Sequence, residues 1–298
     1  MKDGKKLSNL VKPYRVGDGA KFRLKDHSPG DTGGLPAEYK TRAAELLKKS
    51  IEELAELQQK LYAQDRWALL LIFQAMDAAG KDSTIKHVMS GVNPQGVQVY
   101  SFKAPSAEEL DHDYMWRAVS RVPERGRIGI FNRSYYEEVL VVRVHPELLA
   151  AQHLPEPLLT KKIWKQRFED ISAYERYLTR NGIVIRKFFL HVSKEEQKRR
   201  FLSRLDDPSK NWKFSEADVH EREHWEEYQS AYEDMIQNTA TEDAPWFVVP
   251  ADKKWFMRLV VGAAVVDALK DLDLEYPVVD ASKKKELALV RKKLAEQK

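Results

Sequence analysis

A continuous apolar run followed by a glycine–lysine turn constrains the fold of this chain more than any other feature. Residues 67–74 are apolar up to Gln74, which is typical of a strand buried on both faces of a sheet. The chain then turns at Gly80 and Lys81, and residues 81–90 have the pattern of a helix. A buried strand that leads through a tight turn into a helix predicts an α/β fold.

Strand and helix patterns alternate along the rest of the chain. A capping box at Ser106 and Glu109 predicts a helix up to about Arg121. The alternation predicts a parallel sheet in a three-layer α/β/α architecture. Further strands are expected near residues 97–102, 127–131, 183–192 and 246–249. We interpret residues 1–36 as an irregular N-terminal arm, 37–276 as the main domain with a helical lid at about 198–222, and 277–298 as a basic tail that forms a surface helix.

The segment of residues 75–84 resembles a phosphate-binding loop in both composition and context. It approximates the pattern Gly-x4-Gly-Lys-Ser/Thr, with Ala75 at the first glycine and Asp82 at the hydroxyl position. Backbone N–H groups at such a turn, together with the helix dipole, bind phosphate oxygens. The residues expected to form the loop are Ala78, Ala79, Gly80, Lys81, Asp82 and Ser83.

Three side chains form the expected catalytic set. Lys81 is expected to contact the transferred phosphoryl group. A lysine that is merely solvated is disfavoured at a helix N-terminus, because its positive charge opposes the helix dipole. Asp77 is the expected ligand of a magnesium ion, with water and phosphate oxygens completing the coordination shell. Arg133 follows the strand near 127–131, at the edge where open α/β sheets bind ligands.

Other residues are expected to assist these three. Arg143 is a second candidate for binding phosphate. Glu137 is expected as the closing residue of a capping box begun by Ser134 and as a site residue, two roles that can coexist. Trp212 is interpreted as a core or interface aromatic. Arg199 has two interpretations, a solvated helix residue or a contact with substrate. The cations of the lid that are expected to bind a polyanion are Arg200, Arg204 and Lys213.

The composition of the chain excludes several classes of function. The 298 residues include no cysteine, which excludes disulfides, thiolate metal sites and a cysteine nucleophile. A net charge of +4 is too mild to require a nucleic-acid partner. No apolar run approaches the ~20 residues of a membrane span. Residues 1–12 are basic but are not followed by an apolar stretch, so a secretory signal is not expected. We therefore expect a cytoplasmic protein with neither a nucleic-acid nor a membrane partner.

Several motifs, in matching order along the chain, resemble those of the family-2 polyphosphate kinases. The resemblance runs from about residue 12 to about residue 276. The motifs are QAMDAAGKDSTI (74–85), GVNP (91–94), FNRSYYE (131–137), KFFLH (187–191), RLD (204–206), WK (212–213) and APW (244–246). The resemblance implies a P-loop kinase fold with a helical lid, similar to thymidylate kinase. It also implies that polyphosphate donates its terminal phosphoryl group to AMP and then to ADP, giving ATP.

Two positions within these motifs bear on the substrates. Ala75 in place of glycine and Asn132 in place of aspartate resemble the subgroup that phosphorylates both nucleoside mono- and diphosphates. Because Asn132 is neutral, the resemblance points to Asp77 as the metal ligand and to Asn132 as a nucleotide or phosphate contact. It further implies Mg²⁺, with Mn²⁺ as an alternative, and a homo-oligomer, either a tetramer or a dimer.

Two other functions are open at the level of sequence. An ATP-dependent nucleoside monophosphate kinase would have the same fold and loop, so only an assay with polyphosphate as the sole donor separates the two. A non-enzymatic polyanion-binding protein would instead bind DNA or RNA with steep salt dependence. For such a protein, Lys81→Ala would not change the result of a phosphoryl-transfer assay.

Overall fold

The computed structural model describes residues 9–209, 211–214 and 216–297, and a six-stranded sheet lies at the centre of this part of the chain. The strands are β1 (Arg15–Val16), β2 (Ala68–Gln74), β3 (Val97–Ser101), β4 (Ile128–Asn132), β5 (Ile183–His191) and β6 (Trp246–Pro250). Their order across the sheet is β1-β6-β5-β2-β4-β3. The strands β2 to β6 run parallel, and the edge strand β1 is antiparallel to β6.

The central strand β2 explains the apolar run of the sequence. It pairs with β4 on one side and with β5 on the other, and every one of its residues is buried. A strand enclosed on both edges and both faces has no solvent-facing position for a polar side chain. Its last residue, Gln74, leads directly into the turn that is expected to form the phosphate loop.

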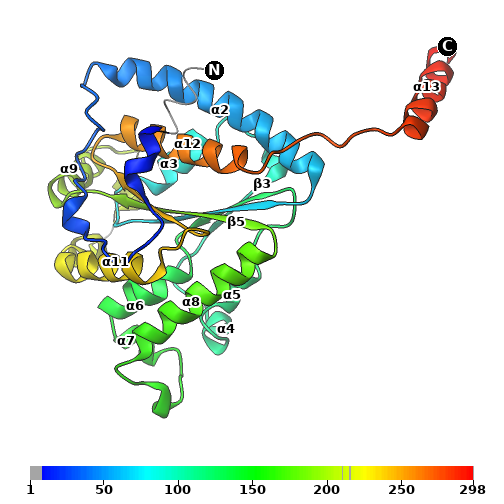
Figure 1. The fold of residues 1–298 in the computed structure, drawn as a ribbon. Helices are drawn as coiled ribbons and strands as arrows, with labels where there is room; N and C mark the ends of the chain where they lie inside the picture. The colour runs from blue at the N-terminus through cyan, green and yellow to red at the C-terminus, as the bar shows by residue number, and fades with distance from the viewer. Residues whose placement is uncertain (1–8, 210, 215, 298) are drawn as a thin grey trace.

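Helices cover both faces of the sheet, as Figure 1 shows. One layer consists of α2 (Tyr39–Gln64), α3 (Lys81–Val88) and α12 (Lys254–Lys270). The opposite layer contains α6 (Val141–Val144), α7 (Glu147–Ala150), α8 (Ile163–Arg180) and α11 (Trp225–Thr239). The predicted three-layer α/β/α fold with a parallel sheet is therefore confirmed.

Shorter elements connect these layers. The α-helices among them are α4 (Ala107–Asp111), α5 (Trp116–Val119), α9 (Lys194–Leu205), α10 (Ala217–Glu221) and, at the C-terminal end, the longer α13 (Ala281–Ala295). The 3-10 helices are η1 (Lys12–Tyr14), η2 (Leu24–Asp26), η3 (Pro94–Gly96), η4 (Tyr135–Val139), η5 (Glu156–Leu158) and η6 (Asn211–Lys213).

The N-terminal arm contains a strand that the sequence does not predict. Arg15 pairs with Phe247, and Val16 pairs with Trp246, so the arm extends the sheet beyond β6. Arg15 also forms an ion pair with Glu242 at 2.7 Å. A two-residue strand is too short to show the alternation from which strands are recognised.

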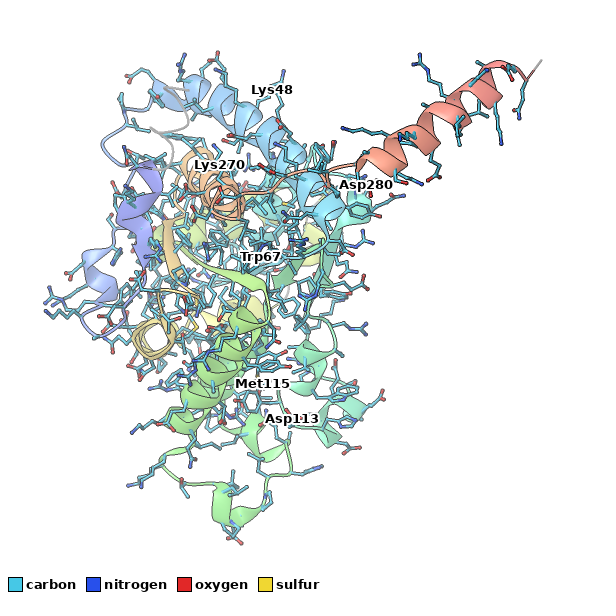
Figure 2. All side chains as sticks on the ribbon, turned by 45° about the vertical axis from the view of Figure 1, so that its right-hand side comes forward. Lys48, Trp67, Asp113, Met115, Lys270 and Asp280 are labelled. Atoms are coloured by element: carbon cyan, nitrogen blue, oxygen red, sulfur yellow. The ribbon has the colours of Figure 1, made fainter. Side chains whose placement is uncertain are left out.

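The single helix expected from residue 106 to about residue 121 is wrong, because it is divided into α4 and α5. Its capping box does form: the Glu109 N–H donates to Ser106 Oγ, and the Ser106 N–H donates to Glu109 Oε2. Beyond α4, Asp113 Oδ1 accepts a hydrogen bond from the Met115 N–H at 2.9 Å; both residues are labelled in Figure 2. Aspartate side chains compete in this way with helical hydrogen bonding.

The C-terminal helix α13 stands apart from the body of the protein (Figure 1), and its side chains project on all sides (Figure 2). Asp280 Oδ1 caps it by accepting from the Lys283 N–H at 2.7 Å. All residues of α13 are exposed, so the tail forms the surface helix that the sequence predicts. Within the described ranges, no helix combines the length and the apolar character needed to cross a membrane.

Candidate active site

A cavity of about 930 Å³ opens where the parallel strands end at their carboxyl termini. Its wall combines the turn after β2, the segments after β3 and β4, and residues from α9, η6 and the start of α12. Open α/β sheets bind their ligands at this edge. All residues of the expected phosphate loop line the cavity, namely Ala78, Ala79, Gly80, Lys81, Asp82 and Ser83.

The backbone of the expected phosphate loop contains two left-handed residues just before α3. Ala78 has a φ of 58° and Gly80 a φ of 106°, both in the left-handed region. A side chain at Gly80 would be strained there, and its Cβ would lie 3.3 Å from Met257 Cε. The first hydrogen bond of α3 joins the Thr84 N–H to the Gly80 carbonyl, so the N–H groups that precede it at the helix start have no helical partner.

Helix α9 holds the carbonyl side of this loop. Gln197 Nε2 donates to the Asp77 carbonyl at 2.9 Å, and Arg200 Nη1 donates to the carbonyls of Ala78 and Ala79 at 3.0 and 2.7 Å. Arg200 Nη2 also donates to the carbonyl of Ala251, beyond β6. The sequence predicts Arg200 as a lid contact with substrate. The structure instead places its guanidinium on main-chain carbonyls, where it supports the phosphate loop.

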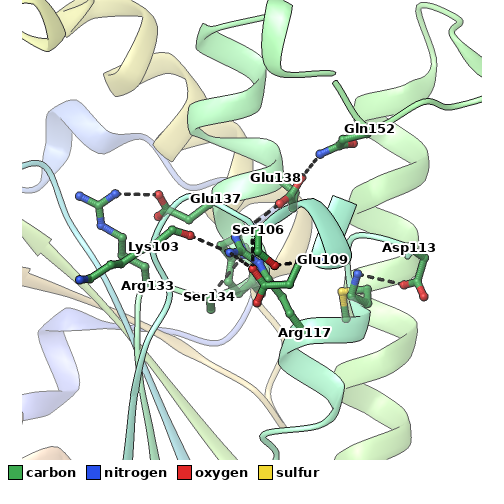
Figure 3. A network of polar contacts seen from close by, with 12 residues as sticks. Lys103, Ser106, Glu109, Asp113, Arg117, Arg133, Ser134, Glu137, Glu138 and Gln152 are labelled. Carbon is green, nitrogen blue, oxygen red and sulfur yellow. Dashed lines mark hydrogen bonds and ion pairs between the residues drawn. The ribbon is translucent and has the colours of Figure 1, made fainter. Parts of the chain in front are cut away.

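Arg133 joins two acidic side chains at the edge of the cavity. Its Nη2 lies 3.0 Å from Asp77 Oδ1, and its Nη1 lies 3.4 Å from Glu137 Oε2; the second pair is drawn in Figure 3. The negative charges of Glu137 and Asp77 raise the pKa of Arg133, so this residue is always a cation. Arg133 has a φ of 65°, and strained non-glycine residues of this kind cluster at functional sites.

Glu137 does not close a capping box, so that prediction is wrong. Ser134 Oγ accepts from the Tyr136 N–H at 3.2 Å and thereby starts the 3-10 helix η4 instead of an α-helix. In this 3-10 helix the Glu137 carboxylate does not reach the Ser134 N–H but pairs with Arg133. Glu137 as a site residue stays a prediction: it pairs with Arg133 but does not itself line the cavity.

Lys81 and Asn132 each contact the loop. Lys81 Nζ donates to the Ala75 carbonyl at 2.7 Å. Desolvation, followed by the nearby Arg133 charge, lowers the pKa of Lys81. Asn132 Nδ2 donates to Asp82 Oδ1 at 2.7 Å, so the amide of Asn132 orients one of the loop carboxylates.

Of two further residues expected in the site, Arg143 has another position, and the side chain of Lys213 is not described. Arg143 Nη2 lies 2.5 Å from Asp234 Oδ2, where it joins α6 to α11, and Arg143 is not part of the cavity wall. Lys213 ends η6, and its side chain lies outside the described part of the chain. Arg204 and Arg199, in contrast, both line the cavity.

Trp212 is not a core residue, contrary to that part of the sequence interpretation. It is 74% exposed, lines the cavity, and donates its indole N–H to the Ser209 carbonyl at 3.0 Å. Trp225, in contrast, is buried. The sequence signal that separates them is context, because Trp212 lies in a polar break between helical patterns.

Two lysines of the cavity are missing from the sequence prediction. Lys103 follows β3 at a distance of two residues, and Lys254 starts α12 shortly after β6. Both positions follow the carboxyl end of a parallel strand, which is a signal that the sequence contains. Desolvation and the charges of Arg200 and Arg258 lower the pKa of Lys254.

Positive charge dominates the cavity wall. The acidic side chains of the wall are Asp77 and Asp82. Its cations are Lys81, Lys103, Arg133, Arg199, Arg200, Arg204 and Lys254. A wall of this composition fits a ligand with several negative charges along its length, because each phosphate can replace the water around one or more cations.

The carboxylates of the wall also fit a divalent metal ion of the magnesium type. Within the described ranges, no cluster of three or more histidine, aspartate or glutamate side chains could hold a metal by itself. Magnesium, however, binds through one or two carboxylates plus water and phosphate oxygens. Asp77 and Asp82 supply hard oxygen donors of this kind beside the phosphate loop.

A phosphate loop at the carboxyl edge of a parallel sheet, open to a cavity rich in cations, defines a P-loop phosphotransferase. The comparison with protein families agrees. The family model "Polyphosphate kinase 2 (PPK2)" matches residues 37–277, which is most of the chain. The chain therefore belongs to the polyphosphate kinase 2 family, as its motifs indicate.

The names of similar proteins contain polyphosphate. The "ADP-polyphosphate phosphotransferase" of Rhodopseudomonas palustris is 50% identical and covers 95% of this chain and 98% of its own. The "AMP/ADP-polyphosphate phosphotransferase" of Meiothermus ruber is 43% identical, with coverage of 92% and 98%. The crystal structure of polyphosphate kinase 2 from Arthrobacter aurescens has a TM-score of 0.86 at 41% identity, with coverage of 95% and 96%.

Proposed function

We propose that the protein transfers the terminal phosphoryl group of inorganic polyphosphate to AMP and ADP, giving ADP and ATP. One observation carries this proposal: a single cavity combines the phosphate loop with six cationic side chains besides Arg200, which holds the loop carbonyls. That number exceeds what a mononucleotide acceptor needs and suits a second, extended chain of phosphates. The names of the relatives, which specify polyphosphate as donor, support this donor.

The reaction needs positioning more than proton transfer. The acceptor phosphate is largely ionised near neutral pH, because its second pKa is about 6. One of its oxygens forms a bond to the terminal phosphorus of polyphosphate. The bond from that phosphorus to the bridging oxygen breaks, and the shortened polyphosphate leaves with the electron pair. No proton is transferred, so a general base is not required.

Lys81 and Arg133 have complementary roles in this reaction. The N–H groups at the start of α3 and the Lys81 ammonium bind the oxygens of the transferred phosphoryl group. Burial disfavours the charge of Lys81, and a bound phosphate beside it favours that charge again. The planar guanidinium of Arg133, held by Asp77 and Glu137, presents N–H groups to a phosphate in a fixed orientation.

Asp77 would hold a Mg²⁺ ion, and Mn²⁺ would use the same oxygen donors. A bound ion of this type neutralises negative charge on the phosphates. The side chain of Asp77 is one third exposed and faces the cavity. Asn132 lines the cavity and donates a hydrogen bond to Asp82, and this position supports a contact between Asn132 and a bound phosphate.

The lid at about 198–222 would close over the bound phosphates. Arg204 and Trp212 already line the cavity from this segment, and Lys213 adjoins them in sequence. Closure would exclude water and limit hydrolysis of the donor. The proposal includes a kinase domain over 37–276 between the arm and the basic tail, a cytoplasmic location, and a dimer or tetramer. It includes neither a nucleic-acid nor a membrane partner.

A transfer assay with polyphosphate as the only donor tests the proposal. We expect ATP from ADP, and ADP from AMP, in the presence of Mg²⁺. Lys81→Met should lower the rate by about 10²–10³-fold, which is typical of removing one preorganised stabilising group. Lys86→Met is the matched control, because Lys86 is exposed on the same helix and lies outside the cavity wall.

Three outcomes would contradict this function. Transfer from ATP but not from polyphosphate would indicate a nucleoside monophosphate kinase. Tight, salt-dependent retention of DNA without any transfer would indicate a polyanion-binding protein. Product from ADP but not from AMP would restrict the acceptor to the one named for the Rhodopseudomonas relative.

A further inference from the structure

Arg117 is a buried cation that does not line the cavity but contacts the segment that does. Its side chain is 9% exposed, and its Nη1 donates to the Lys103 carbonyl at 2.7 Å. The guanidinium also lies 5.6 Å from the centre of the Phe102 ring, and Phe102 packs edge-on against Phe131 of β4. The wall formed by residues 102–104 is therefore held from behind by this arginine.

Arg117 also faces Glu138, whose side chain is 5% exposed (Figure 3). Arg117 Nη2 lies 3.8 Å from Glu138 Oε1, and Arg167 Nη1 lies 3.4 Å from Glu138 Oε2. Arg167 Nη1 donates to the Glu138 main-chain carbonyl at 2.9 Å, and Gln152 Nε2 donates to the carboxylate at 2.6 Å. We call this set of three charges the Arg117–Glu138–Arg167 cluster.

The 3-10 helix η4 links this cluster to the cavity. Its consecutive residues Glu137 and Glu138 have different partners: Glu137 faces Arg133, and Glu138 faces Arg117 and Arg167. Buried ion pairs of this kind contribute little net stability, because apolar residues of similar volume often stabilise a fold as well. A positional role explains better why charges are buried behind the site.

From this geometry we infer that Arg117 is a positioning residue that fixes two walls of the phosphate site relative to one another. Through the Lys103 carbonyl it anchors one wall, and through Glu138 it anchors η4, which carries Glu137 toward Arg133. In the part of the chain that the structure describes, Lys103 Nζ has no acidic partner, so its charge can bind a phosphate. An anchored main chain lowers the entropy that Lys103 loses on binding.

The ligand in this inference, a chain of phosphates, rests on the proposed function, so the test measures binding separately from transfer. Tripolyphosphate is titrated by calorimetry into four proteins: wild type, Arg117→Met, Lys103→Met and the double variant. Each single substitution should weaken binding about tenfold, which corresponds to the loss of one charged hydrogen-bonding group. Because Arg117 acts partly through Lys103 and partly through Glu138, the double variant should bind more weakly than either single variant but clearly less than a hundredfold more weakly than wild type.

Two further variants keep this cycle interpretable. Arg121→Met is the matched control, because Arg121 is exposed and its guanidinium lies 5.4 Å from the Tyr100 ring without joining the cluster. It should change the Kd by less than about twofold. Arg117→Lys retains a cation and should recover part of the affinity. It replaces Arg117→Met in the cycle if that variant does not fold.

Multiplicative effects of the substitutions at Arg117 and Lys103 would overturn the inference, as would unchanged binding by Arg117→Met. Wild-type protein that binds tripolyphosphate but does not phosphorylate ADP would contradict the proposed function alone. Wild-type protein that does not bind tripolyphosphate would contradict both.

Discussion

Replacement of Arg200 by lysine should destabilise the protein although the charge is conserved. The Arg200 guanidinium donates to four main-chain carbonyls, those of Ala78, Ala79, Ala251 and Asp252, and to Glu196 Oε1. These bonds tie the phosphate loop to the chain beyond β6. A lysine ammonium is compact and cannot span both segments.

The size of this effect follows from counting acceptors. The guanidinium serves five acceptors in the structure, whereas an ammonium has three donors, so at least two acceptors lose their partner. A buried acceptor without a partner costs ~1–3 kcal/mol. We therefore expect Arg200→Lys to lower the free energy of unfolding by about 4 kcal/mol.

The neighbouring arginine offers a matched control for stability. The Arg199 side chain is 67% exposed and forms its hydrogen bonds with Glu196 alone. Arg199→Lys should therefore lower the free energy of unfolding by less than ~1 kcal/mol. Equilibrium unfolding in urea, followed by tryptophan fluorescence, measures both variants. If Arg200→Lys unfolds at the same urea concentration as Arg199→Lys, the support of the loop by Arg200 is refuted.

Two further outcomes concern buried charges. Lys187 is fully buried and lies 2.5 Å from Glu175, so Lys187→Met should lower the free energy of unfolding in urea by ~3–5 kcal/mol. Adding Glu175→Leu should restore much of this stability, because it removes the unpaired buried charge. No recovery in the double variant would contradict this account. Burial lowers the pKa of His191 from 6.5 to about 4, so the unfolded chain binds a proton between these values while the folded chain does not. Stability should fall by about 3 kcal/mol more in wild type than in His191→Gln between pH 6.5 and pH 4, and equal slopes would contradict the assignment.

Features that are local in the chain could be predicted from the sequence. The apolar run before Gln74 and the turn at Gly80 and Lys81 correspond to β2 and the start of α3. Their pattern is readable because the residues that determine it are adjacent in sequence. The helix expected from 106 to about 121 was wrong for the opposite reason. Periodicity does not show that Asp113 prefers to bond with the Met115 N–H.

The chemical identity of the candidate site also follows from local sequence. Gly80 permits the left-handed turn, Lys81 supplies a cation at a helix start, and Asp77 supplies a carboxylate in the loop. The contributions of Lys103 and Lys254 come from other elements. They join the site only because the parallel strands bring their carboxyl ends to the same edge of the sheet.

Tertiary structure alone assigned the arginines their different roles. Arg199 and Arg200 are adjacent in the chain and chemically identical, and a helix rotates them about 100° apart. The packing of α9 against the phosphate loop turns Arg200 toward the loop carbonyls and leaves Arg199 exposed at the cavity. Sequence specifies that two cations occur at this point. Which one faces the protein depends on the surface that α9 meets, and residues more than a hundred positions away supply that surface.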